Sequence, residues 1–337
     1  MIKIGKPISK TLLARTFVWK QQVHSQNRIH AARMLEKANH DEIVRCLICD
    51  NLTFPYTEVD KVAYGHCKYC NHVQSSIRPS AGFLETLYGS EEPDYSSQDL
   101  AYVNLSQLAL DSRVDDIAAP KVEWIKSSLN FDPKDLWLDI GSGTGETLLA
   151  ARKAGFSVLG IEISPSEISL AQSRSVPTIP MFFDGSQKIA ELKTAKVISV
   201  LNILEHTLDP LYFLSGISQQ MSSGSYLVIE VPRLNGFSSI IQCAHPNTVY
   251  RHIFSPEHLN IFSDESMDFC LDKLSMERQA TWYFGSDAIE IFGYVIELTQ
   301  PHFDKGLDGY SNEINLLQQQ IDNAGLSDVM LLVTKKK

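Results

Sequence analysis

The sequence has no apolar run long enough to span a membrane. Its longest apolar stretches, such as the one from Val197 to Leu204, fall well short of the roughly 18 residues that a spanning helix needs. The chain also shows no signal-peptide pattern, no internal repeat and no low-complexity tract beyond the lysines at 335–337. These absences exclude a membrane-embedded protein and favour a cytoplasmic one without a membrane partner.

Acidic side chains are absent from residues 1–35, which contain seven lysines and arginines. The 337 residues hold 30 basic and 40 acidic side chains, a formal charge of −10, so residues 36–337 carry 23 basic and 40 acidic side chains, or −17. An acidic body disfavours an extended phosphate-binding surface, and we do not expect nucleic acid as its partner. The basic arm, residues 1–40, is expected to be helical, and its composition is also compatible with an organellar presequence.

Cysteine is scarce, yet four of the six cysteines form two close pairs. Two residues separate Cys46 from Cys49 and Cys67 from Cys70, and 17 residues lie between the pairs. Two residues between thiolates allow one tight turn to point both sulfur atoms at a tetrahedral ion, and the second pair completes four ligands. The spacing predicts a zinc ion, and two disulfides are the alternative for a secreted protein.

A zinc ion with four cysteine ligands has no open coordination position, so we expect a structural ion. It would hold together a module at residues 41–80 that has too few apolar residues for a core of its own. His66 and His72 flank the second pair and are alternative ligands. Cys243 and Cys270 stand alone and are expected to be ordinary buried or half-buried thiols.

Short apolar runs alternate with helical patterns in the second half of the chain. Such runs are typical of strands that are buried on both faces of a parallel sheet, and we expect strands at residues 136–140, 157–161, 197–201 and 226–231. Ser164 and Asp209 each precede a proline and are expected to cap helices. The alternation predicts a doubly wound α/β domain at residues 131–337, after a connector and helical segment at 81–130.

A glycine-rich turn follows the first of these strands, in the sequence LDIGSGTGE from Leu138 to Glu146. Glycines let the backbone turn sharply and lie against a ligand beside the next helix. The spacing differs from the G-x-G-x-x-G of dinucleotide binders, because Glu146 stands where the third glycine would fall. Glu162, at the end of the second strand, is either an acceptor for both ribose hydroxyls of a nucleoside or a solvated charge at a helix start.

Five segments between residues 130 and 232 resemble, in order and spacing, the motifs of class I S-adenosylmethionine-dependent methyltransferases. They are LDIGSGTG, VLGIEISPSEI, FDG, VLNILEHTLDP and GSYLVIEVP. The resemblance implies a Rossmann-like methyltransferase fold with S-adenosylmethionine as the cofactor and methyl transfer as the activity.

The same resemblance implies a role for each cofactor-binding residue. The turn of Gly141, Ser142, Gly143 and Gly145 would approach the methionine part of the cofactor, with Asp139 near its amino group. Glu162 would take the ribose, Ile163 would cover one face of the adenine, and Asp184 would accept from the adenine amino group. Asn202 would lie beside the sulfonium from which the methyl group leaves.

The upstream half is similar to bacterial methyltransferases with an N-terminal zinc-binding domain, including those that act on sugars and other small molecules. Residues 233–275 are similar to the substrate-side insert of small-molecule members, but only about 100 residues follow Pro232, fewer than in the sugar C-methyltransferases. We expect a small-molecule acceptor, such as a sugar or an intermediate of polysaccharide or secondary metabolism. The alternatives are an RNA or protein methyltransferase that uses the module and arm as a platform, and a scaffold without the chemistry.

Methyl transfer from a sulfonium is an in-line displacement, so the protein mainly aligns the reacting atoms and excludes water. An acceptor hydroxyl or acidic carbon would also need a base, and the candidates are Glu205, His206, His252 and His258. We prefer His206, because it follows the fourth strand at the edge where α/β sheets bind ligands; the alternative is that it only orders the loop. Tyr95 and Tyr102 of the connector would either close over the cofactor or serve packing.

Overall fold

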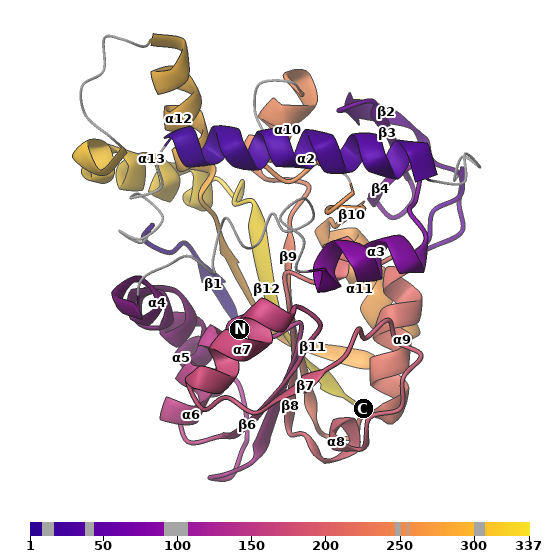
Figure 1. Ribbon diagram of the computed structural model, residues 1–337, viewed down its shortest axis with the longest axis vertical. Coiled ribbons are helices and arrows are strands. Elements are labelled where there is room, and N and C mark those ends of the chain that lie inside the picture. The colour runs from indigo at the N-terminus through magenta and orange to yellow at the C-terminus, as the bar shows by residue number, and fades with distance from the viewer. Residues whose placement is uncertain (9–16, 38–43, 91–106, 247–250, 255, 300–306) are drawn as a thin grey trace.

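The computed structural model (Figure 1) describes residues 1–337 apart from 9–16, 38–43, 91–106, 247–250, 255 and 300–306. Tyr95 and Tyr102 lie outside the described residues. No helix of the described segments has the length and apolar character needed to cross a membrane.

An eight-stranded sheet forms the centre of the molecule. In spatial order its strands are β1 (Ile2–Ile4), β11 (Met276–Phe284), β12 (Val329–Lys336), β9 (Tyr226–Pro232), β8 (Val197–Leu201), β5 (Leu136–Ile140), β6 (Ser157–Glu162) and β7 (Thr178–Pro180). Adjacent strands run parallel, except that β12 is antiparallel to both of its neighbours. The doubly wound α/β prediction is therefore confirmed, and the four predicted apolar runs form β5, β6, β8 and β9.

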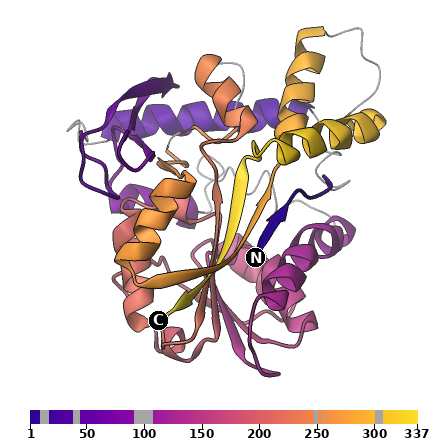
Figure 2. The ribbon, with the colours of Figure 1, turned by 180° about the vertical axis from the view of Figure 1, so that it is seen from behind.

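Helices cover both faces of this sheet (Figures 1 and 2). One side carries α4 (Gln107–Arg113), the π-helical turn η2 (Val114–Ala118), α5 (Ala119–Ser127), α6 (Glu146–Lys153) and α7 (Pro165–Ser173); the other carries α8 (Ala190–Thr194), α9 (Pro210–Gln220) and α11 (Asp264–Lys273). Ser164 and Asp209 cap α7 and α9 as predicted, because each side chain accepts a backbone N–H three residues on, with proline following the cap.

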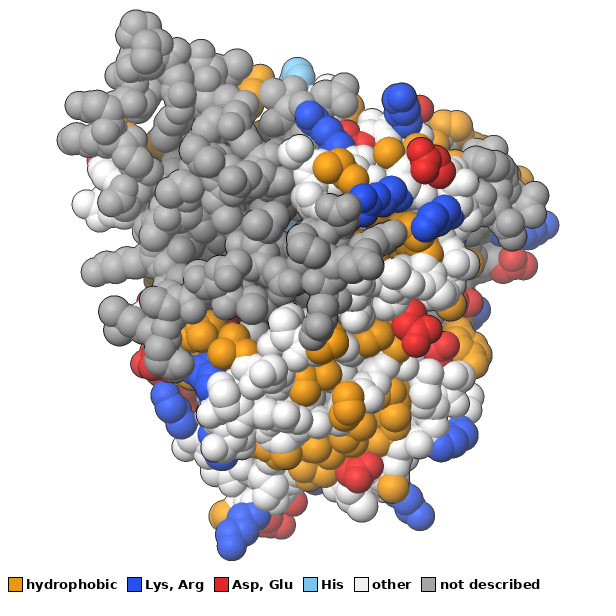
Figure 3. Space-filling view, viewed as in Figure 1, with side chains coloured by type: hydrophobic (Ala, Val, Ile, Leu, Met, Phe, Trp, Pro, Cys, Tyr) orange, Lys and Arg blue, Asp and Glu red, His pale blue; other side chains and the backbone are white. Residues whose placement is uncertain are grey.

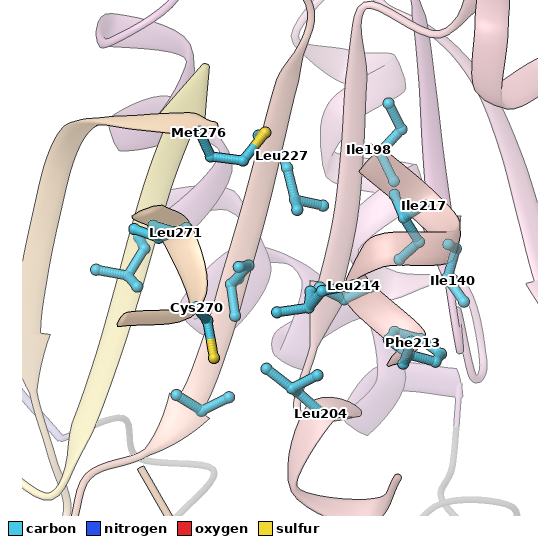
Figure 4. Packing of buried hydrophobic residues seen from close by; sticks show 14 of the residues in the cluster. Ile140, Ile198, Leu204, Phe213, Leu214, Ile217, Leu227, Cys270, Leu271 and Met276 are labelled. Carbon is cyan, nitrogen blue, oxygen red and sulfur yellow. The ribbon is translucent and has the colours of Figure 1, made fainter. Parts of the chain in front are cut away.

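The strands alternate their side chains between two apolar cores. In β5, Trp137 packs with side chains of α5 and α6, whereas Leu138 and Ile140 belong to the core formed with α8, α9 and α11. Figure 4 shows this second core, where Leu214 of α9 and Cys270 of α11 lie against the sheet. Burial on both faces explains why the strand sequences are continuously apolar rather than alternating.

The chain winds outward from β5 in both directions. It continues to β6 and β7 on one side and then returns to β8 and β9 on the other, so the strand order reverses between β5 and β8. Ligands of open α/β sheets bind outside the carboxyl ends of the strands at such a switch point. The glycine turn after β5 and the turn η3 (Leu204–His206) after β8 both lie there.

A second, antiparallel sheet contains the segment with the cysteine pairs. Its strands are β2 (Phe54–Val59), β3 (Val62–His66), β4 (Val73–Ser75) and β10 (Asn260–Ile261). β10 comes from residues 233–275 and pairs with β4, and Cys46, Cys67 and Cys70 lie in the same buried core as α9 and α11. The cysteine module therefore shares both a sheet and a core with the rest of the molecule.

The N-terminal arm is only partly helical, which corrects the sequence expectation. Helix α2 (Phe17–Lys37) runs across the molecule to the small sheet (Figure 1), where Ala31 and Met34 pack with Val62. Residues 2–4 instead form β1, because their backbone pairs with β11 almost 280 residues away, a contact that no local pattern reveals. The remaining elements are α3 (Ala81–Gly89), α10 (Phe237–Ala244), α12 (Asp287–Thr299), η4 (Leu307–Tyr310) and α13 (Ser311–Asn323).

Candidate functional site

A cavity of about 490 Å³ opens at the switch point of the large sheet. Its walls come from the carboxyl ends of β5, β6 and β8, from η2 and α5, and from α3 beyond the cysteine module. The volume lies in the range of small-molecule and cofactor sites. Eight of the nine predicted cofactor residues line it: Asp139, Gly141, Ser142, Gly143, Glu162, Ile163, Asp184 and Asn202. Gly145 is not in the lining and instead forms the N-cap of α6.

The glycine turn has a conformation that suits only glycine. Gly141, with φ of 70°, and Gly145, with φ of 79°, lie in the left-handed region. A Cβ atom on Gly141 would collide with the side chain of Ile203 from the loop after β8. The turn is therefore bare backbone facing the cavity, which is the kind of cradle that a close-lying ligand needs.

Glu162 supports the glycine turn from β6. Its carboxylate accepts the N–H of Gly143 at 2.9 Å, of Ile163 at 2.7 Å and of Ser164 at 2.9 Å. The side chain is therefore fixed by hydrogen bonds and is not a solvated charge at a helix start; it is 7% exposed. A carboxylate has about four lone-pair sites, so these three bonds leave one free.

Asp139 is buried beneath the glycine turn. Its carboxylate accepts a short hydrogen bond from the Ser199 hydroxyl of β8, which in turn accepts from the indole of Trp137. Burial raises the pKa of Asp139 to about 7, with a smaller upward contribution from the charge of Glu162, while the Ser199 hydrogen bond opposes the shift. A cationic group in the cavity would favour the charged form of Asp139.

The other predicted cofactor residues lie around the same cavity. Asn202 directly follows β8 with φ of 56°, a conformation that asparagine tolerates better than most side chains, and its amide donates to Glu230 at 3.3 Å. Asp184 accepts the N–H of Ser186 at 2.8 Å. Ile163 lies directly under Gly89 at the end of α3, so closely that a Cβ on Gly89 would meet its side chain at 2.9 Å.

Two ion pairs hold basic residues of the lining, and neither was predicted from the sequence. Arg113, just before η2, binds Glu146 through Nε–Oε1 at 2.6 Å and Nη2–Oε2 at 3.1 Å, and Lys121 of α5 binds Glu230 at 2.6 Å. π-helical turns are rare and often occur at functional sites. The one signal in the sequence was Glu146, which departs from the glycine pattern at the position that begins α6.

Of the four predicted bases, His206 alone lines the cavity. Its Nδ1 lies 2.6 Å from the carbonyl oxygen of Glu257 and 3.1 Å from the hydroxyl of Tyr88, which also lines the cavity. Burial lowers the pKa of His206, while Glu257 opposes the shift. Burial therefore favours the neutral form of this imidazole at the cavity wall.

The other three predicted bases lie outside the lining. Glu205 is 1% exposed, and burial, with a smaller contribution from Glu230, raises the pKa of its carboxyl well above the usual range. Burial also lowers the pKa of His258 well below its ordinary value. His252 has its Nε2 only 3.2 Å from the carboxylate of Asp328, at the N-terminal end of β12. Of the four residues, His206 is therefore the one whose side chain lies at the cavity wall.

Arg78 is a second feature that the sequence reading missed. Its buried guanidinium donates to the carbonyl oxygens of Thr207 at 3.0 Å and Leu208 at 2.6 Å, and to the Asn260 side chain at 2.7 Å. Thr207 and Leu208 line the cavity, so Arg78 fixes one cavity wall to the strand that joins the cysteine module.

The four paired cysteines converge on one point. Each contributes a sulfur atom within 4.8 Å of the others, and the Cys46–Cys70 and Cys49–Cys67 sulfur pairs are 3.5 and 3.4 Å apart. A tetrahedral zinc ion with bonds of about 2.3 Å separates its sulfur ligands by about 3.8 Å, so the cluster fits such an ion. All six cysteines are free thiols, so the disulfide alternative is not realised.

The two cysteine turns have the same geometry. The N–H of Asp50 donates to the Cys46 carbonyl and that of Asn71 to the Cys67 carbonyl, each at 2.8 Å, and both residues have a left-handed backbone. His66 and His72 do not belong to the cluster. His66 bonds Asn71 at 2.7 Å, and the His72 ring packs on Phe262 with centroids 4.9 Å apart.

Comparisons with known proteins give the family of the central segment. Residues 115–274, a little under half of the chain, match a family model described as a methyltransferase domain. No curated protein matches the sequence.

Solved structures resemble the chain only distantly. They include a SAM dependent methyltransferase from Archaeoglobus fulgidus (19% identity, 68% of this chain and 100% of that one, TM-score 0.45). Geranyl diphosphate C-methyltransferase from Streptomyces coelicolor A3(2) is 12% identical over 69% of this chain and 87% of its own, with a TM-score of 0.43. The [4+2]-cyclase SpnF is 16% identical over 65% and 81%, with a TM-score of 0.44. These likenesses carry no argument about substrate.

The matched domain contains the glycine turn, the strand reversal and most of the residues that line the cavity, so the family match and the geometry describe one site. The chain therefore contains a methyltransferase domain built on a Rossmann-like sheet.

Proposed function

We propose that this methyltransferase acts on a small molecule, such as a sugar or an intermediate of polysaccharide or secondary metabolism. The observation that carries the proposal is the charge of the cavity. Its lining has six carboxylates and two cationic side chains, Arg113 and Lys121, and both cations are paired with carboxylates. An acidic cavity of about 490 Å³ suits the cationic cofactor and a compact acceptor, and it disfavours a polyanion.

The lining supports a specific placement of the cofactor. The methionine part would lie on the backbone of Gly141, Ser142 and Gly143, with its amino group toward Asp139. The ribose would face Glu162, and the adenine would lie between Ile163 and Asp184. This placement uses the bare backbone of the glycine turn and leaves Asn202 beside the sulfonium, where the methyl group departs. Gly145 would contribute through the shape of the turn, because it does not line the cavity.

The acceptor would then occupy the side of the cavity formed by His206 and Tyr88. Both line the cavity, and they are hydrogen-bonded to each other at 3.1 Å. In-line transfer requires the acceptor atom, the methyl carbon and the sulfur in one row, and a rigid wall on this side favours that alignment. Changing His206 to Ala is expected to lower turnover while cofactor affinity stays within about threefold; unaltered turnover would remove His206 from the reaction.

The zinc ion is the second part of the proposal. We propose that Cys46, Cys49, Cys67 and Cys70 bind one structural zinc ion. Four sulfur ligands leave no position for water or substrate, so the ion would stabilise the module and not take part in the chemistry. Arg78 of the module would link this stability to the cavity wall, because its guanidinium donates to the carbonyl oxygens of Thr207 and Leu208.

An RNA or protein acceptor is the alternative. Figure 3 shows acidic and basic side chains interspersed over the described part of one face, without a field of one sign. Two lysines of the arm lie against aromatic rings of the body, since Lys3 Nζ is 3.4 Å from the Trp282 ring centre and Lys6 Nζ 5.6 Å from that of Phe284. These observations favour a metabolite over a polymer.

Methyl transfer from labelled S-adenosylmethionine tests the acceptor class. The enzyme is incubated with a small-metabolite extract and, separately, with RNA and protein fractions from the same cells. Label in the small-metabolite fraction is expected; label confined to RNA or protein would overturn the proposal.

Calorimetry tests the cofactor site: Glu162→Gln should weaken S-adenosylmethionine binding about tenfold or more, as expected for loss of a charged hydrogen-bond acceptor. Glu85→Gln, an exposed change on α3, is the control.

A further inference from the structure

We propose that Glu205, His206 and His258 form a binding site for one divalent transition-metal ion beside the cavity. The three side chains each offer one ligand atom, and these atoms all lie within 4.8 Å of one another. Two imidazoles and one carboxylate are a common ligand set for such ions. The site is separate from the four cysteines and uses residues that methyl transfer from a sulfonium does not itself require.

The backbone brings the three ligands together. Glu205 and His206 are adjacent in η3, directly after β8, and His258 immediately precedes the segment that forms β10. The N–H of Leu259 donates to the carbonyl oxygen of Glu205 at 2.8 Å, so the residue next to His258 is tied to η3. The amide of Asn260 also donates to the Thr207 carbonyl at 2.7 Å. The arrangement is therefore built by two segments that are hydrogen-bonded together.

Both imidazoles are oriented as metal ligands usually are. The Nδ1 of His206 lies 2.6 Å from the carbonyl oxygen of Glu257, and the Nδ1 of His258 lies 2.8 Å from that of His252. A carbonyl oxygen only accepts, so Nδ1 carries the hydrogen in each ring and the lone pair of the neutral ring is on Nε2. A backbone carbonyl that holds the far nitrogen is typical of metal-bound histidine. The Nε2 of His206 is 3.9 Å from Oε1 of Glu205.

Glu205 supplies the independent observation that points to a ligand. The side chain is 1% exposed, and its Oε2 has no hydrogen-bond partner among the described residues. A buried carboxylate oxygen without a partner is costly, because it has lost its water without a replacement. An ion between Glu205 and the two imidazoles would satisfy this oxygen.

The ligand chemistry selects the kind of ion. Magnesium and calcium prefer oxygen ligands, whereas imidazole nitrogen suits zinc, iron, cobalt and similar ions. Three protein ligands leave coordination positions open, and His206 also lines the cavity. An acceptor oxygen in the cavity could fill an open position; this last step rests on the proposed function, whereas metal binding does not.

The proposal also changes the role of His206. A metal ion on Nε2 uses the lone pair that a general base would need, so the two roles exclude each other in the metal-bound enzyme. His206 would then act on the acceptor through the ion.

Cobalt titration of the full-length, zinc-loaded protein tests the site. With the cysteines occupied by zinc, wild-type protein should bind one further Co²⁺ per chain and show visible ligand-field bands without the strong thiolate-to-cobalt band. Glu205→Gln and His258→Ala should weaken this binding at least about tenfold, in line with the sensitivity of metal sites to their immediate surroundings. His245→Ala, which removes an exposed histidine, should leave it unchanged.

Two further readouts keep the outcome clear. Circular dichroism melting identifies any variant that fails to fold. If the zinc-loaded wild-type protein binds no Co²⁺, the metal site is overturned without any variant. Equal Co²⁺ uptake by the folded Glu205→Gln variant would also overturn it. Calorimetry with S-adenosylmethionine on the same samples tests the proposed cofactor site separately. Lost cofactor binding with intact Co²⁺ binding would count against the proposed function alone.

Discussion

Arg113 and Glu146 form a two-pronged ion pair at the wall of the cavity, with nitrogen–oxygen distances of 2.6 and 3.1 Å. The pair joins the π-helical turn to the first residue of the helix that follows the glycine turn. Both side chains are mostly buried, at 12% and 17% exposure, so solvent screens the pair less than a surface salt bridge. The pair therefore fixes the start of α6 relative to the segment before η2 on the cavity wall.

Glu146→Gln should lower the free energy of unfolding by about 2 kcal/mol, because it leaves the mostly buried Arg113 without its charged partner. Urea unfolding measures the change. Glu313→Gln, in the first turn of α13 and exposed, is the matched control for the loss of a helix-start charge and should cost less than about 1 kcal/mol. Equal losses in the two variants would show that the ion pair contributes nothing beyond the helix dipole.

Gly141→Ala should destabilise the protein and weaken binding of S-adenosylmethionine. The new methyl group would collide with Ile203, and φ of 70° is itself unfavourable for alanine by about 1–2 kcal/mol. Gly224 provides the matched control, since its φ is 79° and nothing lies within 4 Å of an added Cβ. Thermal melting should show a smaller loss for Gly224→Ala, and calorimetry should show normal cofactor affinity only for that variant.

The affinity for S-adenosylmethionine should rise with pH around neutrality. Burial raises the pKa of Asp139 to about 7, so below that pH the free enzyme holds a proton that the cofactor's ammonium group would displace. Calorimetry between pH 6 and 8 should show tighter binding at the higher pH and release of protons at the lower. Asp139→Asn should bind S-adenosylmethionine more weakly and lose the pH dependence of the affinity. An affinity of the wild type that does not change with pH would show that Asp139 does not bind the ammonium group.

The sequence predicted the parts of the fold that depend on local patterns. Continuous apolar runs predicted the first and last residues of β5 and β8, because both faces of these strands are buried. The caps Ser164 and Asp209 predicted where two helices begin. The glycine turn was recognisable because its backbone requires residues without a Cβ.

Long-range contacts were not predictable in the same way. β1 pairs with a strand near the other end of the chain, and the partners of Arg113 and Arg78 lie 33 and about 130 residues away. The sequence favoured His206 among the four possible bases because it follows the fourth strand, and His206 is the one of the four that lines the cavity. The closeness of His258 to His206 is a long-range contact that local sequence does not reveal.

Removal of the predicted zinc ion should destabilise more than the cysteine module. Cys46, Cys67 and Cys70 lie in the same buried core as α9 and α11. Loss of the ion would therefore loosen a core that the module shares with the rest of the molecule. Cys49→Ser should reduce zinc content below one ion per chain and lower stability by several kcal/mol. Cys243→Ala, outside the cluster, should keep the zinc. Full zinc loss with an unchanged melting temperature would contradict the shared core.

His252 should act in stability rather than in methyl transfer. Its Nε2 lies 3.2 Å from Asp328, which also accepts from Arg251 at 2.6 Å, and the residue does not line the cavity. His252→Gln should therefore lower the melting temperature and leave S-adenosylmethionine affinity unchanged. Weaker binding of S-adenosylmethionine by the variant, without a loss of stability, would show that His252 does contribute to the cavity site.

The pH dependence of stability gives this assignment a second test. Burial, and then the charge of Arg251, lowers the pKa of His252, so between the unfolded value of about 6.5 and the folded value the unfolded chain binds a proton that the folded protein does not. Stability therefore falls as pH drops below about 6.5, by up to about 1.4 kcal/mol per pH unit for one histidine. Asp328 acts at lower pH: burial alone would raise its pKa, but Arg251 and His252 hold it well below the usual range, so its contribution is lost below about pH 4. Urea unfolding from pH 5 to 7 should show a slope reduced by up to one proton in His252→Gln, because the glutamine cannot take up the proton that the unfolded wild type binds.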